Sequence, residues 1–238
     1  MSEELKPFPD DWTTALAVVA HPDDIEFGAA GAVAAWTKAG KTVSYVLASR
    51  GEAGIDGMSP DEAAPVREAE QRESAKIVGA SSVEFLDLPD GTIEYGTALR
   101  RAIAATIRRH RPELLLTFNF HDRFSSGRWN SPDHRNLGRA ALDSVADAAN
   151  RWIFPDLDEE PWTGVRHLAV ANSPHPTHAV DVSGSLDQAV ASLEAHRTYL
   201  DGLRPPVSDV RGPLTALAAQ TGERFGGRPA IAFEVIPC

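Results

Sequence analysis

The chain has 238 residues, of which 42% are hydrophobic and 24% are charged. These proportions are typical of a soluble globular protein and exclude a collagen, a coiled coil or a wholly disordered chain. Its 34 acidic residues outnumber its 23 lysines and arginines, which gives a formal net charge of −11. A chain of this charge repels phosphate backbones, so we expect no nucleic-acid partner.

The sequence contains one cysteine, Cys238, at its last position. A single thiol forms no internal disulfide and no cysteine-rich metal site, and it suits a reducing compartment. Residues 1–11 lack the basic and apolar regions of a secretory signal. The longest apolar runs, such as residues 15–20, are too short to span a bilayer. We therefore expect a cytoplasmic protein without a membrane partner.

The first part of the chain alternates short apolar runs with stretches of helical spacing. Buried strands are predicted at residues 14–20, 42–48, 83–86 and 113–118. The helices that follow them in turn are predicted at residues 27–38, 66–78, 98–110 and 135–150. Four successive strand–helix units favour a three-layer, Rossmann-like α/β fold, with a mostly parallel sheet and helices on both faces.

The last third of the chain is less regular. Short strands are predicted at residues 167–171, 179–182 and 230–236, and a helix at residues 186–200. Segments rich in proline or acidic residues predict surface loops at residues 155–162 and 202–213. Because no clear linker interrupts the sequence, we predict a single domain over residues 1–238. Its core lies at about residues 14–200, and residues 201–238 form a C-terminal elaboration.

Two segments that carry histidine follow predicted strands. Residues 20–26 read AHPDDIE after the first strand, and residues 130–135 read NSPDHR after the fourth. Ligands of an open parallel sheet bind beyond the carboxyl ends of its strands, so these segments are expected to converge. Two histidines and one carboxylate with an open fourth position form a common catalytic zinc site, and the other carboxylates can act as a base. The residues alone leave open whether Asp23 or Asp24 is the ligand.

In these two segments the chain resembles the PIG-L/LmbE-like family of zinc-dependent N-deacetylases. The first family motif, A-H-P-D-D-x-E, is matched in full by residues 20–26. The second, H-x-D-H, is matched in part by residues 131–134. The resemblance extends over roughly residues 15–200 and covers most of the chain. It implies an N-deacetylase that uses zinc (Zn²⁺).

The resemblance also implies roles for individual residues. Asp23 would be the general base, and Asp133 would support catalysis by orienting and polarising a neighbouring group. Arg67 and Trp129 would contact the substrate, although Arg67 and Glu70 could instead form a surface ion pair, and Asp133 could be only a helix N-cap. The implied zinc ligands are His21, Asp24 and His134.

Ser131 departs from the family pattern. The better-known members carry a histidine at this position, which stabilises the transition state or protonates the leaving amine. Serine does not titrate near neutral pH and cannot replace an imidazolium. His121, with Asp122 and Arg123, and His196 are the candidates for this task.

We therefore expect a metal-dependent amide hydrolase that removes an acetyl group from a small N-acetylated amino sugar or a related metabolite. Two alternatives remain open. One is an amidase of the same chemistry that acts on a larger amide conjugate. The other is a non-catalytic metal- or sugar-binding domain, against which the intact Asp23 argues. Because family members are often multimers, a homo-oligomer is also expected.

Overall fold

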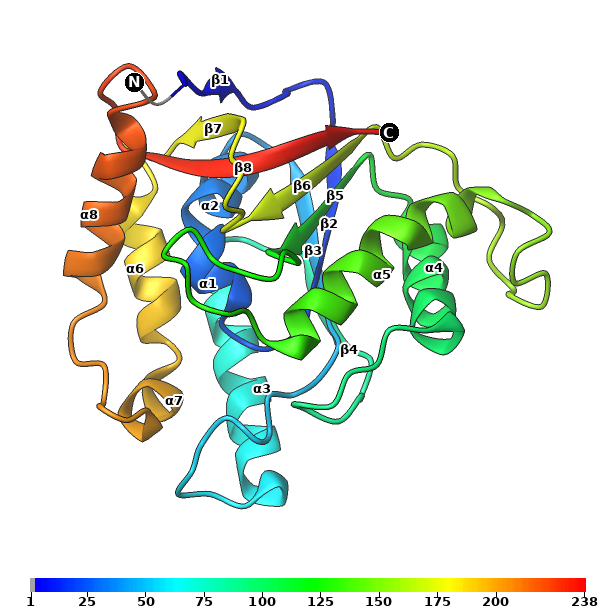
Figure 1. The fold of residues 1–238 in the computed structure, drawn as a ribbon, viewed down its shortest axis with the longest axis horizontal. Coiled ribbons are helices and arrows are strands. Elements are labelled where there is room, and N and C mark those ends of the chain that lie inside the picture. The colour runs from blue at the N-terminus through cyan, green and yellow to red at the C-terminus, as the bar shows by residue number, and fades with distance from the viewer. Residues whose placement is uncertain (1–2) are drawn as a thin grey trace.

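An eight-stranded sheet forms the centre of the computed structural model, which describes residues 3–238 (Figure 1). The strand order is β1-β7-β8-β6-β5-β2-β3-β4. The strands are β1 (Lys6–Pro7), β2 (Thr14–Val19), β3 (Thr42–Leu47), β4 (Ser82–Phe85), β5 (Leu114–Phe118), β6 (His167–Ala171), β7 (His178–Asp181) and β8 (Ala230–Pro237). Within the described chain only β8 runs antiparallel to its neighbours, β6 and β7.

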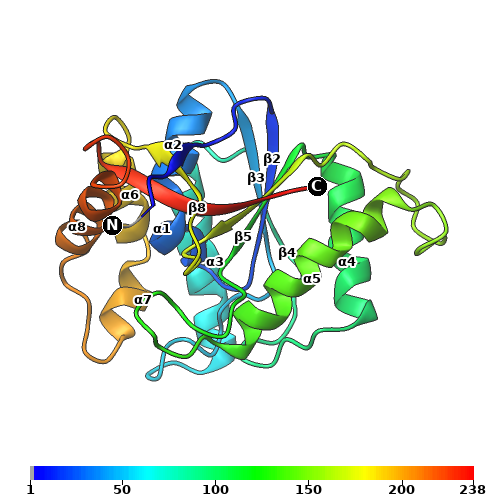
Figure 2. The same ribbon diagram turned by 45° about the horizontal axis from the view of Figure 1, so that its top comes forward.

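Helices cover both faces of this sheet (Figure 2). The helices are α1 (Asp24–Gly28), α2 (Ala30–Lys38), α3 (Pro60–Ile77), α4 (Thr97–His110), α5 (Pro132–Ala149), α6 (Leu186–Glu194), α7 (Arg197–Gly202) and α8 (Arg211–Gly222). One hydrophobic core joins the sheet to α2, α3, α6 and α8, and a second joins it to α4 and α5. This arrangement confirms the predicted three-layer α/β fold with a mostly parallel sheet.

The central strand β2 shows why an apolar run was the correct signal for a buried strand. Side chains alternate between the two faces of a strand. Ala15 and Val19 pack in the first core, whereas Leu16 and Val18 pack in the second. A strand that is covered on both faces needs apolar residues at every position, and β2 has them from Ala15 onward.

Several predicted element boundaries were wrong. The helix predicted at residues 27–38 is two helices, α1 and α2, which meet at Ala29. The helix predicted at residues 186–200 is also two helices, α6 and α7, interrupted at His196. The predictions omitted β1 and also α8, whose first residues fall in the segment predicted as a surface loop.

The start of α5 also differs from its prediction, and this difference affects the site. The helix begins at Pro132, three residues before the predicted start at Arg135. Asp133 and His134 therefore lie in the first helical turn, where the backbone fixes their direction more firmly than a loop would. Separately, no helix within residues 3–238 is both long enough and apolar enough to cross a bilayer.

Candidate metal and catalytic site

The two histidine-bearing segments meet at the carboxyl edge of the sheet, between the neighbouring parallel strands β2 and β5. The chain builds the sheet outward from β2 to β3 and β4, and then crosses to β5 and β6 on the other side. This change of direction is a topological switch point, where open α/β sheets bind their ligands.

Three side chains bring possible ligand atoms together at this point. One ligand atom from each of His21, Asp24 and His134 lies within 4.8 Å of the other two. His134 Nε2 is 2.9 Å from Asp24 Oδ1 and 3.3 Å from His21 Nδ1. The other oxygen of Asp24, Oδ2, accepts hydrogen bonds of 3.0 Å from the backbone amides of Ala20 and His21. These amides hold the carboxylate with Oδ1 directed at His134.

Asn130 determines which tautomer the neutral His134 ring adopts. The Nδ2 group of Asn130 donates to the backbone carbonyls of Asn119 and His121, at 2.7 and 3.0 Å. Its side-chain oxygen must therefore face His134 Nδ1, which lies 2.9 Å away. An amide oxygen only accepts hydrogen bonds, so Nδ1 carries a proton, and in the neutral ring Nε2 is the nitrogen that has a free lone pair.

Two carboxylates fix His21 in a similar way. His21 Nε2 lies 3.1 Å from Asp133 Oδ2 and 3.1 Å from Asp90 Oδ1. Both oxygens are acceptors, so Nε2 donates and Nδ1 is left to face His134. Asp133 is itself held by the backbone amides of Gly91 and Ile93, at 2.8 and 3.1 Å. Asp133 thus contacts His21 Nε2. Its role in orienting that ring remains a prediction.

These contacts test whether the three residues fit a metal ion. With both rings neutral, the tautomers favoured by Asn130, Asp90 and Asp133 direct one nitrogen lone pair of His21 and one of His134 toward each other and toward the Asp24 carboxylate. Such an arrangement is repulsive by itself and favourable around a cation. Hydrogen bonds from the far side of each imidazole are the usual support for a metal ligand. The donor set fits a divalent ion and has the composition of a catalytic zinc site.

Asp23 lies beside the three candidate ligands in an unusual backbone conformation. Its φ is +84°, a left-handed value that is uncommon for residues other than glycine and that concentrates at functional sites. Its Oδ2 accepts a 2.6 Å hydrogen bond from Arg67, and its amide donates a 3.0 Å bond to Gln71 Oε1. Gln71 in turn donates a 3.0 Å bond to Glu26, the last residue of the first motif. The motif therefore supplies both Asp23 and part of its support.

The buried charges shift the pKa values of the two aspartates differently. Burial raises the pKa of Asp23 to about 6, although the charge of Arg67 opposes this rise. Burial also disfavours ionisation of Asp24, but His134 and His21 outweigh it and lower the pKa of Asp24. Burial alone would lower the pKa of His21, yet its bonds to Asp133 and Asp90 and the charge of Asp24 raise it to about 10. At this pKa His21 is protonated at neutral pH, and a metal ion would have to displace the proton on its Nδ1.

Arg67, predicted to contact the substrate, is only 2% exposed. Besides Asp23, its guanidinium donates to the carbonyl oxygens of Pro22 and Gly51, each at 2.8 Å. Gly51 has a φ of +65°, and a Cβ at this position would overlap the guanidinium. The position therefore requires glycine. The alternative of a surface pair with Glu70 is wrong, because Arg67 is buried against Asp23 instead.

Two further positions singled out in the sequence, Ser131 and Trp129, are not among the candidate ligands. Ser131 is the N-cap of α5, and its hydroxyl accepts a 3.1 Å bond from the backbone amide of His134. Trp129 is 55% exposed, and the guanidiniums of Arg123 and Arg135 lie 5.2 and 5.0 Å from the centre of its ring. Two cavities meet at the site, and Asp24 and His134 line both of them. Neither Trp129 nor Arg123 lines either cavity.

The two histidines considered as replacements, His121 and His196, do not line the cavities at the site. His121 Nε2 lies 2.7 Å from Glu234 Oε2. His196 is fully buried, with its Nε2 3.7 Å from Glu26 Oε2. Within residues 3–238, His21 and His134 are the only histidines that line the two cavities.

Sequence reasoning missed Asp90 and Tyr199. Asp90 follows β4 in a Pro-Asp-Gly turn, so its place at the carboxyl end of a strand was a usable signal. Tyr199 lines both cavities, and its ring lies 3.9 Å from the Arg67 guanidinium. No sequence signal pointed to it, because its position depends on the break between α6 and α7.

Comparison with known families agrees with this geometry. The model of the family PIG-L, GlcNAc-PI de-N-acetylase, matches residues 16–145, which is more than half of the chain and includes both motifs. The chain belongs to the PIG-L family.

Individual relatives extend this similarity. Over 98% of its length, this PIG-L protein is 28% identical to diacetylchitobiose deacetylase from Thermococcus kodakarensis, of which it covers 86%. Its fold matches that of N,N'-diacetylchitobiose deacetylase from Pyrococcus horikoshii with a TM-score of 0.85 and 24% identity, over 95% of this chain and 85% of the other. It also matches 4-carboxy-2-hydroxymuconate hydratase from Pseudomonas putida, with a TM-score of 0.72 and 20% identity, over 94% and 96% of the two chains. Because the fold is shared with a hydratase, the reaction must be argued from the site.

Proposed function

We propose that this PIG-L protein is a zinc-dependent N-deacetylase that hydrolyses the acetyl amide of an N-acetylated amino sugar. The observation that carries the proposal is the pair of imidazole nitrogens, from His21 and His134, that face the Asp24 carboxylate beside the buried Asp23. Deacetylation of diacetylchitobiose by the Thermococcus relative supports the substrate class.

The metal-binding part of the site consists of His21 Nδ1, Asp24 Oδ1 and His134 Nε2. When bound, a zinc ion supplies Lewis acidity to the attacking water and to the amide carbonyl oxygen. The ligands are held from outside by Asn130, Asp90 and Asp133, whose hydrogen bonds keep the two ring nitrogens free to coordinate.

Asp23 is the general base in this proposal. Arg67 and Gln71 hold one carboxylate oxygen and the backbone amide of Asp23, so its second oxygen remains available for the water. Water adds across the amide: a C–O bond forms, the C–N bond breaks, and acetate and a free amine are released. Asp23 takes a proton from the water and passes one to the leaving nitrogen. We assign it both transfers because no third histidine lines the cavities of residues 3–238.

Release of primary amine from N-acetylglucosamine glycosides and N,N'-diacetylchitobiose, measured with metal-free protein and after addition of zinc, tests this function. The proposal requires turnover that depends on the added metal. Stoichiometric zinc binding with no amine release from any N-acetylated sugar would instead favour a binding domain. Release of amine only from larger amide conjugates would favour an amidase.

The expected cytoplasmic location and the expected homo-oligomer remain predictions. Cell fractionation tests the first, and size-exclusion chromatography with light scattering tests the second.

A further inference from the structure

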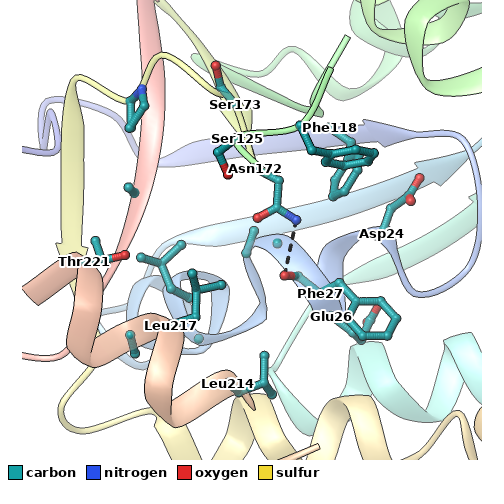
Figure 3. Close-up of a pocket in the computed structure, with 18 of the residues that line it drawn as sticks. Asp24, Glu26, Phe27, Phe118, Ser125, Asn172, Ser173, Leu214, Leu217 and Thr221 are labelled. Atoms are coloured by element: carbon teal, nitrogen blue, oxygen red, sulfur yellow. Dashed lines mark hydrogen bonds between the residues drawn. The ribbon is translucent and has the colours of Figure 1, made fainter. Parts of the chain in front are cut away.

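A cavity of about 810 Å³ extends from the candidate metal site to α8 (Figure 3). It begins at Asp24 and His134 and continues past Phe27 of α1 to Leu217 and Thr221 of α8. A methyl group is about as large as a water molecule, which occupies about 30 Å³ of liquid. The methyl group of an acetyl amide would therefore leave almost all of this cavity empty.

Much of the cavity wall is apolar. Phe118 and Phe124 line it near His134, and Leu214 and Leu217 line it from α8. The two leucines are three residues apart and so lie on the same face of their helix. Leu217 is 49% exposed, which makes it one of the few large apolar side chains that the fold leaves uncovered. An apolar ligand would remove this surface from water.

A second cavity, of about 350 Å³, meets the first at the reaction centre. The two cavities share four lining residues, which are Asp23, Asp24, His134 and Tyr199. Beyond this junction the described wall of the smaller cavity has no large aliphatic or phenylalanine side chain, and it includes the charged groups of Arg67, Asp90 and Asp133. The proposed base and two of the candidate ligands therefore lie between a cavity that has large apolar side chains in its wall and a smaller one that has none.

An amide has a substituent on each side, and each substituent can be placed in one of the two cavities. The carbonyl carbon carries the acyl chain on one side and the amine on the other, so an amide held at the junction reaches into both cavities. The hydroxyl groups of an amino sugar match the charged groups of the smaller cavity. The phenylalanines and leucines of the larger cavity offer a surface on which a hydrocarbon chain can pack.

We propose that this protein hydrolyses amino sugars whose N-acyl chain is longer than acetyl, with the chain bound between α1 and α8. This inference rests on the proposed amide hydrolysis and extends its substrate class. The balance of the reaction is unchanged: water adds, the C–N bond breaks, and a medium-chain carboxylate leaves in place of acetate. Each methylene buried in the cavity favours the longer substrate by about fourfold.

A set of three substrates tests the proposal and separates it from the proposed function. These are the methyl glycoside of N-acetylglucosamine, the methyl glycoside of N-hexanoylglucosamine and the hexyl glycoside of N-acetylglucosamine. We expect kcat/KM for the N-hexanoyl substrate to exceed that of the first substrate by at least about tenfold.

An N-hexanoyl substrate hydrolysed no faster than the N-acetyl one would overturn the inference and leave deacetylation intact. Preference for the hexyl glycoside would overturn it too, because the cavity would then hold the aglycone. If none of the three released amine, the proposed function itself would fail.

A variant of α8 ties the preference to this cavity. Leu217→Gln places an amide in the apolar wall at a half-exposed position that should tolerate it. The ratio of kcat/KM for N-hexanoyl over N-acetyl substrate should fall by about fivefold or more, since the chain then meets a polar group. Ile153→Gln is the matched control, because Ile153 is 37% exposed and does not line the cavity. An equal ratio in both variants would contradict the assignment.

Discussion

At Asp23, the backbone and the carboxylate are each held by a different residue of α3. Arg67 binds the carboxylate and Gln71 binds the amide nitrogen. The fold thus maintains a left-handed conformation that an aspartate rarely adopts. Such strain is expected where the direction of a side chain matters for chemistry rather than for stability.

Replacement of Asp23 by asparagine should separate proton transfer from metal binding. The amide of Asp23→Asn keeps the shape and can still accept a bond from Arg67, but it is not basic. We expect kcat to fall by about 10²- to 10⁴-fold while metal content stays unchanged. Amine release and elemental analysis measure the two quantities. Asp158→Asn, at an exposed position, is the control. Near-normal turnover in Asp23→Asn would show that the base is another group.

Asp90 should influence the metal without touching it. Its carboxylate accepts from His21 Nε2 at 3.1 Å and shares this task with Asp133. In Asp90→Ala, Asp133 still orients the ring, but the ring loses basicity and one constraint. We expect metal affinity to weaken by about 10- to 100-fold, as is usual for such outer partners. Competition with a chromophoric chelator gives the dissociation constant, with Asp158→Ala as the control. An unchanged constant would mean that Asp133 alone is sufficient.

The N-terminus of α5 explains the serine at position 131. Its hydroxyl caps the helix through the amide of His134, so it already has a structural partner. We expect Ser131→Ala to lower the free energy of unfolding by about 1 kcal/mol, and Ser131→Asn, another good N-cap, to retain most of it. Urea denaturation of the three proteins measures this difference.

The same variants test whether Ser131 takes part in catalysis. The hydroxyl oxygen of Ser131 accepts a bond from the helix, and we assign the residue this capping role alone. We therefore expect kcat to change less than about threefold in Ser131→Ala, with the shape of the pH–rate profile unaltered. A loss of about tenfold to a hundredfold with metal retained would instead show that the hydroxyl contacts the transition state.

An element could be predicted when its own residue pattern specifies it, and could not when contacts with distant parts of the chain do. The strand β2 and the helix α4 carry their own patterns, so their sequences were sufficient. The break between α6 and α7 has no glycine or proline to mark it. It occurs where His196 is buried against Glu26 of α1, a contact between distant segments. Helix α8 has exposed Leu217 in place of a continuous apolar stripe, because one side of it faces a cavity.

The position of the site could be predicted, because the order of strands and helices determines which segments meet at the edge of the sheet. Alternating strands and helices imply that the segments after β2 and β5 share one edge of the sheet, and motifs at this edge converge. The tautomers of the two imidazoles could not be predicted, since they depend on Asn130, Asp90 and Asp133 in three-dimensional contact. The cavity beside α8 likewise depends on how a late helix packs against an early one.

Metal removal should destabilise the whole molecule because the ligands join distant parts of the chain. His21 and His134 are separated by 113 positions, and they converge only when β2, β5 and α5 are assembled. The folded chain therefore binds the ion much more tightly than the unfolded chain does. At a free zinc concentration a thousandfold above the dissociation constant, binding adds about 4 kcal/mol to stability. For a protein of this size, that corresponds to a rise in Tm of about 10 °C.

Differential scanning calorimetry in excess chelator and after readdition of zinc measures this rise. The matched control is His134→Ala, which lacks one ligand and should show almost no difference between the two conditions. His110→Ala removes a histidine that pairs with Glu84 outside the site, and it should keep the full zinc-dependent shift. A large zinc effect in His134→Ala would place the stabilising ion elsewhere on the molecule. Absence of any effect in the unmodified protein would mean that the three donors do not bind zinc tightly enough to hold the two segments together.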